Sequence, residues 1–407
     1  MGLAGTNLEH ARGYNRRVVL EMIRLHGPLS RARIARQTGL SVQAVHNIVD
    51  DLARADLVLS RKTETGGRGQ PASEIVINPA GGYTIGISFD HRRLVVVLVD
   101  LAGTQIGLRD QALAEPQPDK MLELIEEAIG QLCRDKELRA KIWGVGVVMP
   151  ALIESGSLVS FGPSSMPHWE GYPLAERLHA RLGLPVYVEN DATAAAVGEH
   201  LYGIGQRLKD FFYIYIGAGI GSGMIFAGHP YSGSAGRAGE LGHVTVVRDG
   251  RPCQCGNRGC LERYVSLSAA QCFVTGVAEG VTAVDPAILA RAYEAGNERL
   301  SQWISEAASH MGQAIVMIEN LLDPETIVIG GILPEPVMEA VIAGMEPLPA
   351  SVRSRVETGM PRLCKAEVGL ETPALGAAAL PLFNGLTPSF KLLADRGQAS
   401  PAVLRAS

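Results

Sequence analysis

Apolar residues recur at helical spacing in three segments near the start of the chain. The first segment runs from Tyr14 to His26 and stops at a Gly-Pro pair, which predicts one amphipathic helix. Ser30 and Ser41 are typical N-cap residues, and they predict two further helices, the second of which ends at about Ala53. Because the turn between these two helices contains glycine, the pattern is that of a helix-turn-helix.

The third predicted helix has one apolar face and one open polar face. Its apolar positions are spaced i, i+3, i+4 and i+7, at Val45, Ile48, Val49 and Leu52. Near its start the open face carries Gln43, Ala44, His46 and Asn47. Gln and Asn can pair bidentately with adenine in the major groove, so Gln43 and Asn47 are candidates for reading bases. The alternative is a solvated face on a small helical bundle.

A strand–loop–strand pattern follows the three helices. Residues 57–62 and 73–78 have the composition of strands, and a glycine-rich basic loop separates them. Two strands around such a loop form a wing, whose cations are expected to contact phosphates or the minor groove: Arg61, Lys62 and Arg68. We therefore expect residues 1–80 to form a winged helix-turn-helix DNA-binding domain.

Beyond residue 81, strand patterns alternate with helical ones, which favours an α/β fold. Strands are expected at residues 83–88, 94–99, 142–148, 212–216, 223–226 and 326–329, and a helix at residues 121–133. Glycine-rich turns between the strands suit two lobes that close on a ligand. We assign residues 81–390 to these two lobes. The remaining residues, 391–407, lack periodicity and are expected to be disordered.

Composition narrows the class of protein. The 407 residues are 46% hydrophobic and 19% charged, which is typical of a globular protein. We expect a cytoplasmic protein, because six cysteines are too few for a disulfide framework and no signal peptide or membrane span is visible. The net charge of −5 conceals an asymmetry, since residues 1–75 hold 11 Lys and Arg against 7 Asp and Glu. The two parts are therefore expected to have different partners.

One cluster has the composition of a metal site. His243 is followed within 18 residues by Cys253, Cys255 and Cys260, which together provide the four ligands of a tetrahedral Zn²⁺. Since all four positions are filled by protein, the expected role of the zinc is structural. The alternatives are scattered core thiols or a disulfide, and a reducing compartment disfavours the disulfide.

Acidic and amide residues surround this zinc loop. They precede it at residues 189–191 and 240, and follow it at Glu262. Such groups on short loops suit a sugar, whose hydroxyls each need directional donors and acceptors. His243 is expected to bind zinc through one ring nitrogen and a sugar hydroxyl through the other. Glu189 and Glu199 are interpreted as surface charges.

The motif Glu240-x-Gly-His243, followed by Cys253-x-Cys-Gly-x-x-Gly-Cys260-x-Glu262, resembles that of the ROK family of bacterial sugar-responsive repressors and sugar kinases. Supporting motifs lie at residues 188–192, 217–223, 323–331 and 375–378. The resemblance implies an actin-like sugar-kinase fold, with two α/β lobes and a sugar in the cleft. The N-terminal winged helix-turn-helix resembles that of the family's xylose and N-acetylglucosamine repressors.

The resemblance also implies roles for individual residues. Those expected to contact the sugar are Asn190, Asp191, Glu240, His243 and Glu262, and Asp191 would be the general base in a kinase. Family kinases begin this domain with Asp-x-Gly-Gly-Thr-Lys, whereas this chain has Ser88-Phe-Asp-His-Arg-Arg93. Both glycines are missing, so the phosphate-binding loop is expected to be lost and the protein not to be an enzyme. The sugar kinases' Asn in Pro-Asn-Leu-Pro-x-Trp is also absent from residues 164–169.

These features predict a sugar-responsive DNA-binding regulator of carbohydrate genes, most simply a repressor. Its expected partners are operator DNA and a sugar or amino-sugar effector, and it is expected to be a homodimer or homotetramer. The alternative function is an ATP-dependent sugar kinase that carries a DNA-binding head. A third possibility is a zinc-structured interaction module without sugar binding.

Overall fold

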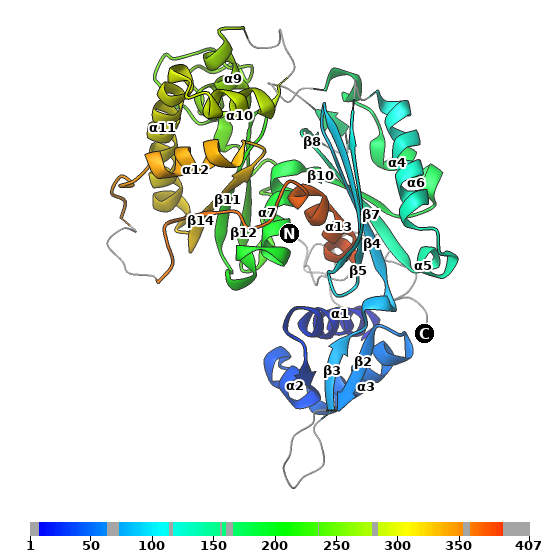
Figure 1. The fold of residues 1–407 in the computed structure, drawn as a ribbon. Helices are drawn as coiled ribbons and strands as arrows, with labels where there is room; N and C mark the ends of the chain where they lie inside the picture. Colours follow the sequence, from blue (N-terminus) through cyan, green and yellow to red (C-terminus); the bar gives the residue numbers. More distant parts are fainter. Residues whose placement is uncertain are drawn as a thin grey trace.

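A computed structural model describes residues 8–62, 73–113, 117–154, 157–159, 166–234, 236–278, 284–352 and 359–385. Figure 1 shows a small N-terminal head below a larger body, and the body consists of two lobes built on separate sheets. The predicted α/β fold class with a helical N-terminal region is confirmed. No helix among the described residues has the length and apolar character needed to cross a membrane.

The head contains three helices and a small sheet in the predicted order. Its elements are α1 Leu8–His26, β1 Leu29–Ser30, α2 Arg31–Thr38, α3 Val42–Arg54, β2 Val58–Lys62 and β3 Ser73–Ile77. Ser30 and Ser41 cap α2 and α3, because their hydroxyls accept hydrogen bonds from the Arg33 and Ala44 amides. Gly39 ends α2 in the left-handed region, with φ 71°. The sheet has the order β1-β3-β2 and is antiparallel.

The head and the body share one hydrophobic cluster. Val19, Leu20 and other core residues of the head pack in a cluster that also contains three side chains of the body, Leu101, Trp143 and Leu382. At the edge of this contact the Lys141 ammonium donates to the Asp56 carboxylate at 3.2 Å and to the Ala80 carbonyl at 2.9 Å. The head is thus packed against the body and is not merely tethered to it.

The sheet of the first lobe has the order β10-β7-β4-β5-β6. Its strands are β4 Tyr83–Phe89, β5 Arg93–Asp100, β6 Gln105–Ala112, β7 Ile142–Met149 and β10 Val186–Asn190. One face packs on α4 Pro118–Leu132 and α6 Leu174–Leu182, and the other on α13 Thr372–Gly385. Smaller elements complete the lobe: α5 Lys136–Ala140, β8 Leu152–Glu154 and β9 Ser157–Val159. Alternate residues of β5 face the two sides, which is why the strand is a continuous apolar run.

The second lobe has a five-stranded sheet in the order β13-β12-β11-β14-β15. Its strands are β11 Phe211–Ile216, β12 Ile220–Phe226, β13 His229–Pro230, β14 Thr326–Gly331 and β15 Leu363–Lys365. Its helices are α7 Asp191–Tyr202, α8 Glu262–Val265, α9 Leu267–Thr275, α10 Pro286–Glu294, α11 Glu298–Leu322 and α12 Glu335–Gly344. One face of the sheet packs in the cluster that includes α9 to α12, whereas α7 packs on the other face.

Helices α7 and α13 lie between the two sheets (Figure 1). Their contact is close because small residues line both helices, and a Cβ at Gly376 would collide with the carbonyl of Ala194. Helix α13 also approaches β4 closely, because a Cβ at Gly86 would collide with the backbone at Ala374 and Ala378. The two lobes are therefore joined through a tightly packed helix pair.

Candidate functional site

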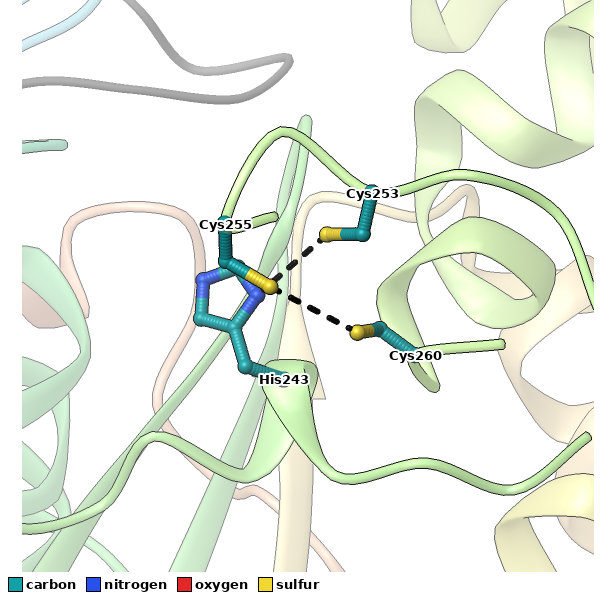
Figure 2. Close-up of side chains that lie close together, drawn as sticks. All are labelled: His243, Cys253, Cys255 and Cys260. Atoms are coloured by element: carbon teal, nitrogen blue, oxygen red, sulfur yellow. Dashed lines mark hydrogen bonds between the residues drawn. The ribbon is translucent and has the colours of Figure 1, made fainter. Parts of the chain in front are cut away.

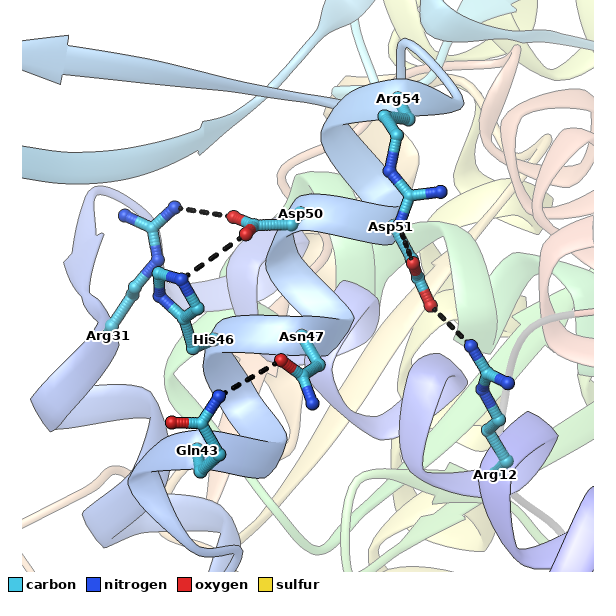
Figure 3. A network of polar contacts seen from close by, with 8 residues as sticks. All are labelled: Arg12, Arg31, Gln43, His46, Asn47, Asp50, Asp51 and Arg54. Carbon is cyan, nitrogen blue, oxygen red and sulfur yellow. Dashed lines mark hydrogen bonds and ion pairs between the residues drawn. The ribbon is translucent and has the colours of Figure 1, made fainter.

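Helix α3 presents the predicted polar face to solvent. Gln43, His46 and Asn47 are exposed, Ala44 is half-buried, and the opposite stripe is buried as the spacing predicts. The Gln43 amide Nε2 donates to the Asn47 Oδ1 at 3.1 Å, so the two candidate base readers lie side by side (Figure 3). Both side chains are exposed, and their role as base readers stays a prediction from the sequence.

Two adjacent carboxylates fix the cations around α3 (Figure 3). Asp50 accepts from Arg31 at 3.1 Å and lies 3.3 Å from the Nε2 of His46. Asp51 accepts from Arg12 of α1 at 3.1 Å and also pairs with Arg54, one turn further along α3. Asp51 therefore ties α3 to α1, whereas Asp50 orients Arg31 at the first position of α2.

The wing is described only in part. Arg61 is exposed on β2, where its backbone lies opposite Glu74 of β3. Lys62 is the last residue of β2, and its side chain lies outside the described residues. Arg68 lies wholly outside them. The roles of these three cations in DNA binding remain predictions from the sequence.

The four predicted metal ligands come together (Figure 2). One ligand atom from each of His243, Cys253, Cys255 and Cys260 lies within 4.8 Å of all the others. The Cys253 sulfur is 3.6 Å from the His243 Nδ1, and the sulfurs of Cys255 and Cys260 are 3.7 Å apart. Zinc–sulfur bonds of about 2.3 Å place tetrahedral ligands roughly 3.8 Å apart. The cluster therefore has the dimensions of a tetrahedral zinc site.

The protonation and orientation of His243 also suit a metal ligand. Burial lowers its pKa, which favours the neutral ring that binds metals. While its Nδ1 faces the sulfurs, its Nε2 lies 3.8 Å from a carboxylate oxygen of Glu240. Of the two ring nitrogens, one points toward the thiols and the other toward a candidate sugar residue.

The loop that carries the cysteines is held by backbone contacts. The Cys253 amide donates to the Asn257 carbonyl at 2.9 Å, and the Val246 amide to the Gly259 carbonyl at 2.9 Å. Gly259 has φ 74°, and a Cβ there would collide with the Val247 carbonyl. Glycine is thus required at this turn of the loop.

The candidate sugar residues gather around the first residues of β12. The Ile220 amide donates to the Glu262 carboxylate at 3.1 Å. Gly242, which precedes His243, packs against the Ile220 carbonyl, and the hydroxyl of Ser222 donates to the Gly239 carbonyl beside Glu240. On the other side, Gly221 packs against Ala192 in the first turn of α7. The start of β12 therefore links the predicted residues of the second lobe to the Asn190-Asp191 pair.

Asn190 has a structural role that its sequence motif did not reveal. Its Oδ1 accepts from the amides of Ala192 and Thr193 at 2.9 and 3.3 Å and so caps α7. Its Nδ2 donates to the Ala151 carbonyl at 3.2 Å. Most of the hydrogen-bonding capacity of this side chain is used within the protein, which leaves one N–H of Nδ2 for a ligand.

Asp191 is the first residue of α7 and is electrostatically unusual. Burial raises its pKa to about 6, the Ala192 amide opposes that shift, and the negative charge of Asp90 adds to it. The same two carboxylates act on Tyr215, whose pKa burial raises well above its usual value. Asp90 of the β4–β5 turn and Asp191 therefore face one region, and the half-buried Tyr215, which the sequence did not single out, lies beside them.

Residues 90–92 form a tight turn between β4 and β5. The Asp90 carboxylate accepts from the backbone amides of Arg92 and Arg93 at 2.7 and 2.9 Å, so these amides have internal partners. The two arginines are engaged as well: Arg93 makes a bidentate pair with Asp110 at 2.6 Å, and Arg92 lies 3.6 Å from Asp285 in the second lobe.

The interpretation of Glu199 as a surface charge is wrong. Glu199 is fully buried, whereas a surface charge was expected. Its carboxylate accepts from the amides of Val368 and Ile204 at 2.8 and 3.2 Å, and it thereby ties α7 to two loops. Nothing in the local sequence signals this burial, because the partners come from distant segments and are backbone groups.

Relatives and solved structures match most of this chain. A xylose repressor of Bacillus spizizenii is 29% identical over 372 residues, which cover 90% of this chain and 94% of the relative. An N-acetylglucosamine repressor of Escherichia coli O6:H1 is 29% identical over 344 residues, covering 81% of this chain and 83% of the relative.

Two solved structures match the fold. A ROK family transcriptional regulator, a homolog of the Escherichia coli MLC protein, has a TM-score of 0.73 at 25% identity and covers 93% of this chain and 98% of its own. A ROK family glucokinase from Streptomyces griseus, in complex with glucose and AMPPNP, has a TM-score of 0.59 at 27% identity and covers 74% and 99%. The ROK family pattern itself matches residues 84–382, and the chain belongs to the ROK family.

Proposed function

We propose that this protein is a sugar-responsive transcriptional repressor. The observation that carries the proposal is that a winged helix-turn-helix with an exposed polar recognition face is packed onto a ROK body. The repressor names of its relatives support the same function. Operator DNA and a sugar are the two ligands, and a homodimer would match a two-fold operator.

In this proposal the head contacts DNA through α3 and the wing. Gln43 and Asn47 read base edges, supported by Ala44 and His46 on the same turn of the helix, while Arg61, Lys62 and Arg68 contact phosphates. Base contacts confer sequence preference, and phosphate contacts confer an affinity that falls as salt rises. The basic balance of residues 1–75 supports this role.

The sugar is proposed to bind beside the start of β12. Asp191, Glu240 and Glu262 offer acceptors for hydroxyl groups, and Asn190 offers its remaining N–H. His243 contributes its Nε2 on the side of Glu240. These residues come from both lobes, so a bound sugar would report on how the lobes are placed.

A structural zinc is proposed at the four-ligand cluster. The residues that would hold it are His243 and the three cysteines, and the metal would fix the loop that positions His243 and Glu262. Its contribution would be to folding, because every ligand position is filled by protein and none is left for a reacting water.

The geometry of the two kinase-type loops argues against phosphoryl transfer. At the β4–β5 turn the backbone amides of Arg92 and Arg93 are bonded to Asp90. At the β11–β12 turn the Ile220 amide is bonded to Glu262. Asp90 also adds negative charge near Asp191, where the phosphates of ATP would have to approach. We therefore infer that the body senses a sugar without phosphorylating it.

A sugar kinase with a DNA-binding head is the second candidate, and one observation favours it. Asp191 is placed at the start of α7 with its pKa raised to about 6, a value that suits a general base. A coupled ATP-consumption assay with D-glucose, D-xylose and N-acetyl-D-glucosamine separates the two functions. The regulator predicts no turnover with any of them, whereas turnover that is lost in Asp191→Asn would establish the kinase.

Sugar binding itself is tested by a thermal-shift screen with the same three sugars. We expect one of these sugars to raise the midpoint temperature of thermal unfolding of the wild-type protein, but not that of Glu240→Gln. The third possibility, an interaction module without sugar binding, predicts no shift with any sugar.

A further inference from the structure

We propose that helix α7 couples the sugar site to the DNA-binding head, and that the buried Glu21–Arg24 pair of α1 is its contact on the head. This inference rests on the proposed function and specifies how that function is regulated. One end of α7 holds candidate sugar residues and the other lies next to the head, so a single rigid element spans the two sites.

The N-terminal end of α7 belongs to the sugar site. Asn190 is its N-cap and Asp191 its first residue, so a ligand that contacts this pair acts directly on the end of the helix. At about 1.5 Å per residue, its 12 residues span roughly 18 Å. A helix of this length transmits a displacement of one end to the other if it cannot bend.

The surroundings of α7 make it stiff. Its middle consists of buried small residues that pack against α13 and β12, namely Ala192, Ala194, Ala195, Ala196 and Val197. The buried carboxylate of Glu199 anchors its last turns to the amides of Ile204 and Val368. Such a close-packed helix moves as a unit.

The C-terminal end of α7 lies against the turn after β5, and that turn packs on α1 of the head. Burial lowers the pKa of His200, and the nearby charge of Arg24 lowers it further. Burial raises the pKa of Tyr202 to about 12, against the opposing effect of the same guanidinium. The packing supports this proximity, because a Cβ at Gly103, in the turn after β5, would lie 3.3 Å from the Tyr202 ring. Leu101 of the same turn shares one hydrophobic cluster with Leu20 and Ile23 of α1.

The Glu21–Arg24 pair is built like a positioning contact. Arg24 donates two hydrogen bonds to Glu21, at 2.9 and 2.7 Å, and the two side chains are only 6% and 14% exposed. Buried ion pairs contribute little net stability but require one geometry, because a displaced partner leaves a charge uncompensated. If the end of α7 moves, the Glu21–Arg24 pair therefore either resists the movement or passes it on to α1.

Within the head, α1 leads directly to the recognition helix. Val19, Leu20 and Ile23 of α1 share the core with the inward stripe of α3. Arg12 of α1 also pairs with Asp51 of α3. A displacement of α1 consequently moves α3, and with it the candidate base readers.

The experiment compares the coupling of two binding events in full-length variants. Affinity for a DNA duplex that the protein itself selects from a random library is measured without and with saturating D-xylose or N-acetyl-D-glucosamine, whichever raises the thermal midpoint. Affinity for that sugar is measured without and with the DNA. Thermodynamic linkage requires the same coupling factor from both directions, and for allosteric proteins it is typically about 5–150-fold.

The test variant is Glu21→Gln with Arg24→Gln, which keeps hydrogen-bonding groups and removes both charges. We expect its separate affinities for DNA and sugar to stay within about threefold of wild type and its coupling factor to fall toward one. Tyr202→Phe tests the α7 side of the contact and is expected to lower the coupling factor as well. If the double variant does not fold, Tyr202→Phe alone decides the test. The control is Asp56→Asn with Lys141→Gln, which removes an exposed ion pair between head and body away from α7 and should keep wild-type coupling.

Three results would count against the inference, and they have different consequences for the proposed function. Wild-type coupling in the double variant and in Tyr202→Phe would show that α7 and α1 do not carry the signal, and would leave the proposed function intact. A wild-type protein whose DNA affinity is unaffected by any sugar that it binds would contradict the proposed function, and the inference with it. Equal loss of coupling in the control would also count against a specific route through α7.

Discussion

Asp191 allows the electrostatics of the proposed sugar site to be tested quantitatively. Its pKa is raised from 3.8 to about 6, chiefly by burial. A shift of about two pKa units corresponds to about 3 kcal/mol of free energy. Because the folded state holds the proton more tightly than the unfolded state, the contribution of this proton to stability is complete below pH 3.8 and is lost as the pH rises toward 6. At neutral pH the charged carboxylate therefore destabilises the folded protein.

Replacing Asp191 by Asn removes this dependence on pH. With these two pKa values, linkage predicts how much of the stabilisation by the protonated carboxyl is lost relative to low pH. The loss is about 1.6 kcal/mol at pH 5 and about 3 kcal/mol at pH 8. The stability of Asp191→Asn relative to wild type should therefore increase by about 1.4 kcal/mol between pH 5 and pH 8. Titrating groups away from this site are shared by the two proteins, so their effects cancel in this comparison.

Urea unfolding at pH 5, 6, 7 and 8, followed by tryptophan fluorescence, measures these differences. Asp249→Asn is the control, because the Asp249 side chain is 88% exposed and its substitution should leave the pH dependence unchanged. If Asp191→Asn and wild type lose stability in parallel across this range, Asp191 does not have a raised pKa. The electrostatic description of the site would then be wrong.

Three further predictions concern the zinc cluster and the head. Cys255→Ser should lose zinc and have a lower thermal midpoint, whereas the control Cys364→Ser should keep the metal. Unchanged zinc content in Cys255→Ser, measured by mass spectrometry, would contradict the assignment. Arg61→Ala should weaken binding to all DNA sequences and reduce the salt slope by about one, and an unchanged slope would remove it from the phosphate contacts. Asn47→Ala should cost about 1–3 kcal/mol at one base position with the salt slope kept, and unaltered base preference in a selection experiment would exclude it as a base reader.

The sequence predicted the elements whose signals are local. The caps Ser30 and Ser41 and the apolar stripe of α3 specify the helix-turn-helix without tertiary information. The His243–cysteine cluster that could hold a metal was predictable because three cysteines share one short loop and His243 is close in sequence. The apolar strands β4, β5 and β7 were found for the same reason.

Some of the elements that the sequence did not predict depend on packing for their identity. Strand β6 is exposed along almost all of its length, so it shows no apolar alternation. Helices α7 and α13 are rich in alanine and lack an amphipathic stripe, because neighbours surround them and small residues are required on several sides. The meeting of Asp90 with Asp191 and the burial of Glu199 likewise depend on contacts between distant segments, which periodicity does not encode.

The most direct test of the account is the affinity of the full-length protein for its selected DNA duplex, measured by fluorescence anisotropy with and without the sugar that raises its thermal midpoint. We expect specific binding that weakens about tenfold or more when the sugar is saturating, with no ATP present. Failure to select any DNA sequence, or an affinity that is the same with and without bound sugar, would contradict it.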